Sequence, residues 1–302
     1  MRRLAGFALL LAVAAAVSGW LASAPSRIDP ARLAGLTGDA ERGRRIFLIG
    51  GCASCHSAPK AEGEEFLKLS GGRRFASPFG TFIAPNISPD PVHGIGNWSD
   101  LDLVNAMLRG VSPDGGHYYP AFPYTSFIRA EIRDVVDLRA YLATLPPVAK
   151  PNLPHEVGFP FNIRRGVGLW KMLHLTDVPR IGVPDDAEIR RGQYLVEALG
   201  HCGECHTARN YLGATRADRW LAGAPSPDGP GRVPNITPHE TGIGDWSAAD
   251  IAEYLLSGFR PDFDTAGGAM VDVIANTSLL PPEDREAIAA YLKSAPPLPA
   301  KR

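Results

Sequence analysis

Two five-residue segments decide how this chain folds. They are Cys52-Ala53-Ser54-Cys55-His56, named the first motif, and Cys202-Gly203-Glu204-Cys205-His206, named the second motif. Together they contain all four cysteines of the 302 residues. Two thiols separated by two residues and followed by a histidine are the attachment site of haem c, in which the thiols form thioethers and the histidine ligates the iron. We therefore predict two covalently bound haem c groups, each with its iron. The residues expected to hold them are Cys52, Cys55 and His56 for haem 1, and Cys202, Cys205 and His206 for haem 2.

Three other uses of paired cysteines fit the sequence less well. Zinc ribbons bring their two pairs within roughly 15 to 20 residues of each other, far closer than positions 52 and 202. A redox-active dithiol needs no histidine after its second cysteine. Structural disulfides suit an oxidising compartment, but they do not explain a histidine at the same offset in both motifs.

The sequence around the motifs is repeated. Pro85-Asn86-Ile87 recurs as Pro234-Asn235-Ile236, Gly94-Ile95-Gly96-Asn97-Trp98-Ser99 recurs as Gly242-Ile243-Gly244-Asp245-Trp246-Ser247, and both halves close with Ala-Tyr-Leu, at 140–142 and 290–292. Internal repetition of this kind predicts two structural units of one fold. We place them at 36–148 and 186–302, joined by a proline-rich linker over 149–185 whose apolar residues should pack on the chain.

The residue pattern predicts short helices between Gly- and Pro-rich loops, with no alternating strand pattern. Pro282 should begin the last helix. Trp98 and Trp246 should pack in the core, each beside a serine that caps the next helix. The apolar face expected of a helix near residue 135 is formed by Ile132, Val135, Val136, Leu138 and Leu142.

The N-terminal segment is typical of export. Arg2 and Arg3 precede an uncharged run over 4–26. Apolar cores of signal peptides span about 7 to 15 residues, whereas a membrane-spanning helix needs roughly 20. The length favours a retained inner-membrane anchor over 1–26, although Ala22-Ser23-Ala24 also fits a cleavage site. Either interpretation places the remaining chain on the periplasmic side. The formal net charge of -1 argues against nucleic-acid binding.

The two motifs, the Pro-Asn-Ile and Gly-Ile-Gly-x-Trp loops and the segment Phe159-Pro160-Phe161-Asn162-Ile163 carry a family resemblance. The chain resembles the cytochrome c subunits of membrane-bound dehydrogenases that oxidise alcohols, aldehydes or sugar acids. The resemblance implies an all-α fold of two tandem class I cytochrome c domains, each around one haem. It also implies a periplasmic dehydrogenase as electron donor and a quinone, a cytochrome or a terminal oxidase as acceptor. The best-known relatives have three haem sites, whereas this chain has two.

The resemblance also suggests where the sixth iron ligand lies. It places a methionine between the second Gly-Ile-Gly loop and the last helix, where Met270 follows two glycines. A methionine ligand raises the potential of a haem. In the same register the first half has Phe122, which cannot bind iron. His117 on that loop is the leading substitute, and the remaining candidates are Met107, Tyr118, Tyr119 and an iron left open.

The favoured function is electron transfer without catalysis, and no catalytic residue is assigned. A methionine on haem 2 alone would give haem 2 the higher potential, so electrons would arrive at haem 1 and leave from haem 2. One alternative is a dihaem enzyme whose open haem 1 iron reacts with peroxide or a small sulfur compound. Another is a gas or redox sensor that uses the same iron.

Overall fold

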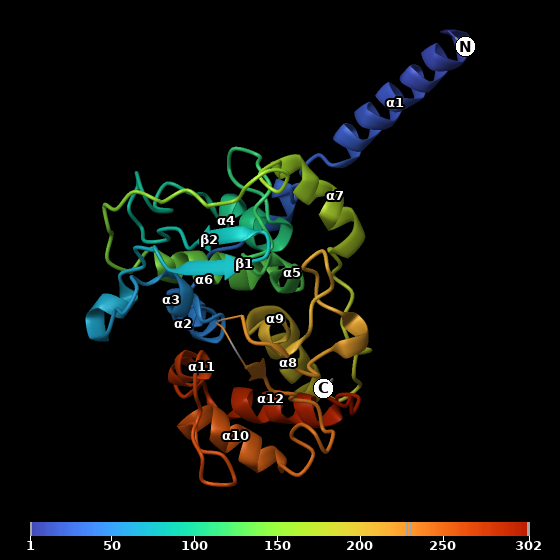
Figure 1. Cartoon of the computed structure of the whole chain (residues 1–302). Coiled ribbons are helices and arrows are strands. Elements are labelled where there is room, and N and C mark those ends of the chain that lie inside the picture. Colours follow the sequence, from blue (N-terminus) through green and yellow to red (C-terminus); the bar gives the residue numbers. More distant parts are fainter. Residues whose placement is uncertain (1, 228, 230, 301–302) are drawn as a thin grey trace.

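The computed structural model describes residues 2–227, 229 and 231–300, with only the backbone described at 2, 5 and 8. The described chain is mainly helical (Figure 1), which agrees with the expected helical class. Helix α1 (Arg2–Ala22) extends away from the rest of the chain and contacts it near its C-terminal end. Among the described residues, no helix has the length and apolarity that a membrane crossing requires. The spanning anchor expected over 1–26 is therefore not supported by the structure.

Apart from η1 in the first half and η3 in the second, the two halves have the same succession of elements. The first half contains η1 (Pro30–Leu33), α2 (Ala40–Ile49), α3 (Cys52–His56), η2 (Gly63–Leu67), β1 (Arg74–Ser77), β2 (Gly80–Ile83), α4 (Asp100–Arg109), α5 (Tyr124–Phe127) and α6 (Ile132–Leu142). The second half contains α8 (Ala187–Tyr194), η3 (Leu195–Leu199), α9 (Gly203–His206), η4 (Ala217–Arg219), β3 (Ala224–Pro225), β4 (Arg232–Val233), α10 (Ala248–Ser257), α11 (Met270–Thr277) and α12 (Pro282–Ser294). Helix α7 (Arg164–His174) lies in the linker between them.

Short strands are the feature that the sequence pattern did not predict. β1 pairs with β2 and β3 pairs with β4, both antiparallel. The strands have four and two residues, too few for an alternating pattern to stand out from the surrounding loops. The expected all-α class is thus confirmed in its mainly helical character, with two short strand pairs added to it.

The first and last helices of each half cross at a glycine. A Cβ atom added at Gly43 of α2 would lie 2.0 Å from the Asp137 carbonyl oxygen of α6. One added at Gly192 of α8 would lie 1.8 Å from the Ala287 carbonyl oxygen of α12. Ion pairs support both crossings, Arg42 with Asp137 and Arg191 with Asp284. The α2–α6 and α8–α12 crossings are therefore versions of one helix pair.

Several local predictions are confirmed. Ser99 and Ser247 cap α4 and α10, each in a capping box with an aspartate three residues later. Pro282 is the first residue of α12. Val135, Val136, Leu138 and Leu142 of α6 are buried as the pattern predicted.

One hydrophobic core runs through both halves. It includes Ile46 and Ile49 from α2 as well as Leu195 and Leu199 from η3. The linker is only partly packed on this body: Val167 and Lys171 of α7 are buried, whereas Phe159 is 81% exposed. The halves therefore contact each other directly, and α7 also bridges them, through Lys171 to Arg109 and through Trp170 to Leu212.

Candidate haem sites

The two motif histidines are held in the same way. His56 Nδ1 lies 2.8 Å from the Pro85 carbonyl oxygen, and His206 Nδ1 lies 2.8 Å from the Pro234 carbonyl oxygen. A carbonyl oxygen only accepts hydrogen bonds, so Nδ1 carries the proton in each ring and Nε2 presents its lone pair. Neither Nε2 atom makes a hydrogen bond to a described residue. This is the orientation and tautomer that iron ligation requires.

The Pro-Asn-Ile repeat explains how those carbonyl groups are fixed. The Asn86 side-chain amide donates to the Val148 carbonyl oxygen at 2.7 Å, and the Asn235 amide donates to the Leu298 carbonyl oxygen at 2.7 Å. Both asparagines are buried. Each one therefore ties its proline loop to the chain that follows the last helix of the same half.

One glycine in each half completes the histidine support, and the sequence analysis missed both. The Gly71 amide donates to the His56 carbonyl oxygen at 2.7 Å, and the Gly223 amide donates to the His206 carbonyl oxygen at 2.8 Å. Both glycines have positive φ, 67° and 86°, which other residues rarely adopt. A glycine preceding each Pro-Asn-Ile loop in both halves was the signal that could have revealed them.

Burial governs the protonation of the motif side chains. Burial lowers the pKa of His56 and His206, against the hydrogen bonds to the proline carbonyls, so both imidazoles stay neutral and able to ligate. Burial, with the neighbouring motif cysteine, raises the pKa of Cys52 and of Cys202 to about 12. In the part of the chain that the structure describes, no group of three or more His, Cys, Asp or Glu side chains could hold a metal ion by itself. The residues present fit a haem held by one histidine and two thioethers.

The two candidate sixth positions differ. Met270 is half-buried and is the first residue of α11. Phe122 lies in an aromatic cluster, with ring centroids 5.8 Å from Tyr118, 5.8 Å from Phe127 and 6.4 Å from Tyr124. The second half thus has a thioether at the candidate position, where the first half has the phenyl ring of Phe122.

His117, the expected substitute ligand, is buried with both ring nitrogens occupied. Its Nε2 lies 2.8 Å from the Ser23 carbonyl oxygen, and its Nδ1 lies 3.1 Å from Lys171 Nζ. To bind iron, the ring would have to release one of these contacts. Among the other candidates, Met107 is buried in the core on α4, and the Tyr119 hydroxyl donates to the Phe161 carbonyl oxygen at 2.9 Å.

Lys171 is a buried cation that the sequence analysis did not single out. Its Nζ donates to the carbonyl oxygens of Arg109 and Gly110 at 2.6 and 2.7 Å, at the C-terminus of α4. It also lies 4.5 Å from the centre of the Tyr124 ring. Burial lowers its pKa to about 7. Lys171 therefore joins the linker helix to the loop that carries Phe122.

The known proteins with similar sequences are c-type cytochromes or cytochrome subunits, as the two motifs predict. No family model matches the chain. It is 58% identical over 294 residues to a protein described as "Diheme cytochrome c-type" from Cereibacter sphaeroides, covering 97% of each chain. It is 38% identical over 260 residues to the fructose dehydrogenase cytochrome subunit of Gluconobacter japonicus, covering 84% of this chain and 52% of that one. It is 34% identical over 265 residues to the gluconate 2-dehydrogenase cytochrome c subunit of Pantoea cypripedii, covering 84% and 59%. The chain thus spans nearly all of the first relative and little more than half of the two dehydrogenase subunits.

Proposed function

Because the chain belongs to the dihaem c-type cytochromes and carries two covalently bound haem c groups, we propose that it passes electrons from a partner dehydrogenase toward the respiratory chain. The single observation that carries this proposal is the pair of neutral histidines, His56 and His206, held alike by proline carbonyls. The dehydrogenase cytochrome subunits among the relatives support a dehydrogenase as donor. A quinone, a cytochrome or a terminal oxidase would take the electrons.

Each half is proposed to form one class I cytochrome c domain, over 36–148 and 186–302. His56 would ligate the iron of haem 1, with Cys52 and Cys55 as its thioether attachments, and the second motif would hold haem 2 in the same way. Each bound haem supplies an iron that alternates between the ferric and ferrous states. The chain's own part is to orient the histidine, keep it neutral and exclude water with the shared core.

The two haems are proposed to have different potentials. Met270 would cap haem 2, and a thioether favours ferrous iron. Phe122 offers no ligand atom, and His117 is engaged by Ser23 and Lys171. Haem 2 would then have the higher potential, so electrons would arrive at haem 1 and leave from haem 2. A redox titration that gives haem 1 the higher potential would contradict this order.

The proposal places the protein on the periplasmic side. Arg2 and Arg3 followed by an apolar run are typical of an export segment. Alkaline phosphatase fused after residue 148 should be active in cells if this is correct. The same fusion, active only when the first 26 residues are deleted, would contradict it.

A second candidate function rests on the first half alone. Because Phe122 cannot bind iron and both nitrogens of His117 are occupied, haem 1 could hold an exchangeable sixth position. The protein would then be a redox enzyme that acts on peroxide or a small sulfur compound.

One experiment separates the two candidates. The optical spectrum of the reduced holoprotein is recorded before and after adding carbon monoxide, and the holoprotein is mixed with a membrane-bound dehydrogenase that lacks its own cytochrome subunit. Two haems that ignore the gas and are reduced when the dehydrogenase substrate is added support the electron carrier. One haem that binds the gas, together with steady consumption of peroxide, supports the enzyme. A holoprotein that the dehydrogenase does not reduce contradicts the leading proposal.

A further inference from the structure

The second motif is bound directly to the first half of the chain. Glu204 is the third residue of that motif, and its Oε1 accepts hydrogen bonds from the hydroxyl groups of Thr125 at 2.6 Å and Ser126 at 2.9 Å. Both hydroxyl groups belong to α5, which begins two residues after Phe122. The carboxylate of Glu204 therefore lies between the haem 2 attachment segment and the helix that follows the Phe122 loop.

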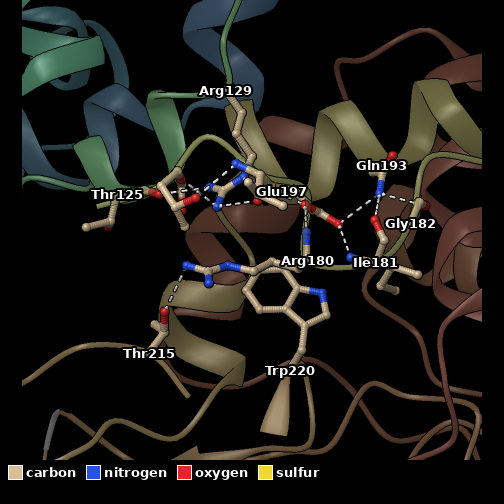
Figure 2. Close-up of polar contacts among 12 residues, drawn as sticks. Thr125, Arg129, Arg180, Ile181, Gly182, Gln193, Glu197, Thr215 and Trp220 are labelled. Atoms are coloured by element: carbon tan, nitrogen blue, oxygen red, sulfur yellow. Dashed lines mark hydrogen bonds and ion pairs between the residues drawn. The ribbon is translucent and has the colours of Figure 1, made fainter. Parts of the chain in front are cut away.

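Glu204 is a charged group in this position. Its side chain is 11% exposed, and Arg209 Nη2 lies 2.7 Å from its Oε2. The ion pair with Arg209 and the two hydroxyl donors of α5 stabilise the ionised carboxylate in this position. The interface beside it is also polar and buried: Arg129, just beyond α5, has its Nε 3.9 Å from Glu197 Oε2 of the second half and donates to the Thr125 carbonyl oxygen at 2.8 Å (Figure 2).

The first motif makes the reverse contact. Ser54 is the third residue of that motif, and its hydroxyl oxygen lies 3.2 Å from the Asn276 side-chain amide nitrogen on α11. Arg73 binds the Ser54 carbonyl oxygen and also lies 3.3 Å from Asp272, again on α11. Helix α11 begins with Met270. Each haem attachment segment is thus tied to the helix that begins at, or two residues after, the candidate sixth-ligand residue of the other half.

The two contacts are equivalent in position and different in charge. Ser54 places a neutral hydroxyl group at the interface, whereas Glu204 places a carboxylate there. A negative charge near a haem stabilises the ferric form and so lowers the haem potential, and it acts more strongly when it is partly removed from water.

We propose that Glu204 is a positioning residue that couples the two haem sites, because its carboxylate joins the second motif to α5 across the interface between the halves. This inference rests on the proposed electron-transfer function. Its consequence is that a change on α5, in the first half, alters the potential of haem 2, in the second half. The first variant is therefore Thr125→Val combined with Ser126→Ala, which removes both cross-interface hydrogen bonds without changing any charge or any motif residue.

Potentials are measured on the purified full-length holoprotein by spectroelectrochemical titration, with the two haems followed by their separate electron paramagnetic resonance signals. With fewer donors to its carboxylate, Glu204 should lower the haem 2 potential in the double variant, changing the ratio of ferric to ferrous haem 2 at a fixed potential by about threefold. An unchanged haem 2 potential in a folded double variant overturns the proposal.

Glu204→Gln keeps the side-chain shape and removes the charge. It should raise the potentials of both haems. For haem 2 the ferric-to-ferrous ratio at a fixed potential should change on the order of tenfold, which equals a shift of about 59 mV for a one-electron couple. Glu253→Gln, at an exposed residue of α10, removes the same charge far from the interface contacts and should move neither potential. A shift confined to haem 2 in Glu204→Gln overturns the coupling, and this variant decides the matter if the double variant fails to fold.

Failure of the proposed function is recognised separately. The pyridine haemochrome assay counts the haems, and reduction by the dehydrogenase reports electron transfer in the unsubstituted protein. If the protein carries two haems and transfers electrons normally, but neither variant changes a haem potential, the coupling proposal is wrong and the proposed function is unaffected. Glu204→Asp should restore most of the native potential, because it restores the charge, and a potential that stays at the Glu204→Gln value counts against the assigned role.

Discussion

The two halves are alike around the motif histidines and unlike at the proposed sixth-ligand positions. His56 and His206 share the proline carbonyl acceptor, the buried asparagine and the left-handed glycine, with distances that agree within 0.1 Å between the halves. On the other side, an aromatic cluster around Phe122 corresponds to a half-buried Met270. The supports of the two motif histidines are therefore duplicated, whereas the residues at the proposed sixth-ligand positions differ.

Exchanging the two diverged residues should have the largest effect. Phe122→Met should give haem 1 a thioether, raise its potential and reduce its binding of carbon monoxide, while Met270→Leu should make haem 2 bind the gas. Optical spectra with carbon monoxide and redox titration measure both changes. Met172→Leu, at a methionine that is 61% exposed on α7, is the control and should behave like the unsubstituted protein. If Met270→Leu leaves haem 2 closed to carbon monoxide, Met270 is not its ligand.

Alanine substitutions at the glycines of the two helix crossings should destabilise the protein to the same extent. Gly43→Ala and Gly192→Ala each place a Cβ within 2.0 Å of a carbonyl oxygen, so each should lower the free energy of unfolding by about 3 kcal/mol. Gly166→Ala in α7, where a Cβ meets nothing within 4 Å, should raise it by roughly 0.5 to 1 kcal/mol. Denaturant unfolding followed by circular dichroism tests these values. A harmless alanine at either crossing would show that the two helix pairs are not equivalent.

Substitution of the two buried asparagines should have a smaller effect on stability, and the effect should be the same in both halves. Asn86→Ala and Asn235→Ala each leave buried carbonyl and amide groups without partners, which should cost about 2 kcal/mol of unfolding free energy in either case. Asn97→Ala removes one exposed hydrogen bond and should cost less than about 1 kcal/mol. The same denaturant unfolding measures these values. Unequal losses of unfolding free energy at the two buried positions would mean that the two asparagines do not contribute equally to stability.

The last prediction is a pH dependence that originates at the linker helix α7. Burial lowers the pKa of Lys171 from 10.5 to about 7, so between these values the unfolded chain binds more protons than the folded chain. Its contribution should therefore make the protein more stable as pH rises from about 7 toward 10.5. Urea unfolding of the native protein and of Lys171→Met at several pH values isolates this slope. The same slope in both proteins would assign the pH dependence to other groups.

The features that could be predicted from the sequence were those encoded by the spacing of residues along the chain and by the internal repeat. The motifs, the helical caps at Ser99 and Ser247 and the start of α12 follow from local residue patterns, and the structure has them where expected. The strands were missed because two or four residues carry too little pattern. The occupied state of His117 could not be predicted either, because its partners Ser23 and Lys171 are distant in the chain and meet it only after folding.

The reciprocal contacts between the halves have a consequence for the origin of the molecule. The first motif meets α11 and the second meets α5, and His201 Nε2 lies 3.2 Å from the Gly50 carbonyl oxygen across the same boundary. In a twofold-symmetric homodimer the same surface of each subunit contacts the other subunit, so each contact occurs twice, once in each direction. A single-haem ancestor with this surface would pair with its own copy, and gene duplication with fusion would make that association independent of protein concentration. In such a fused pair the two copies could diverge, and Glu204, at the motif position that Ser54 has in the first half, is one place where the two halves differ.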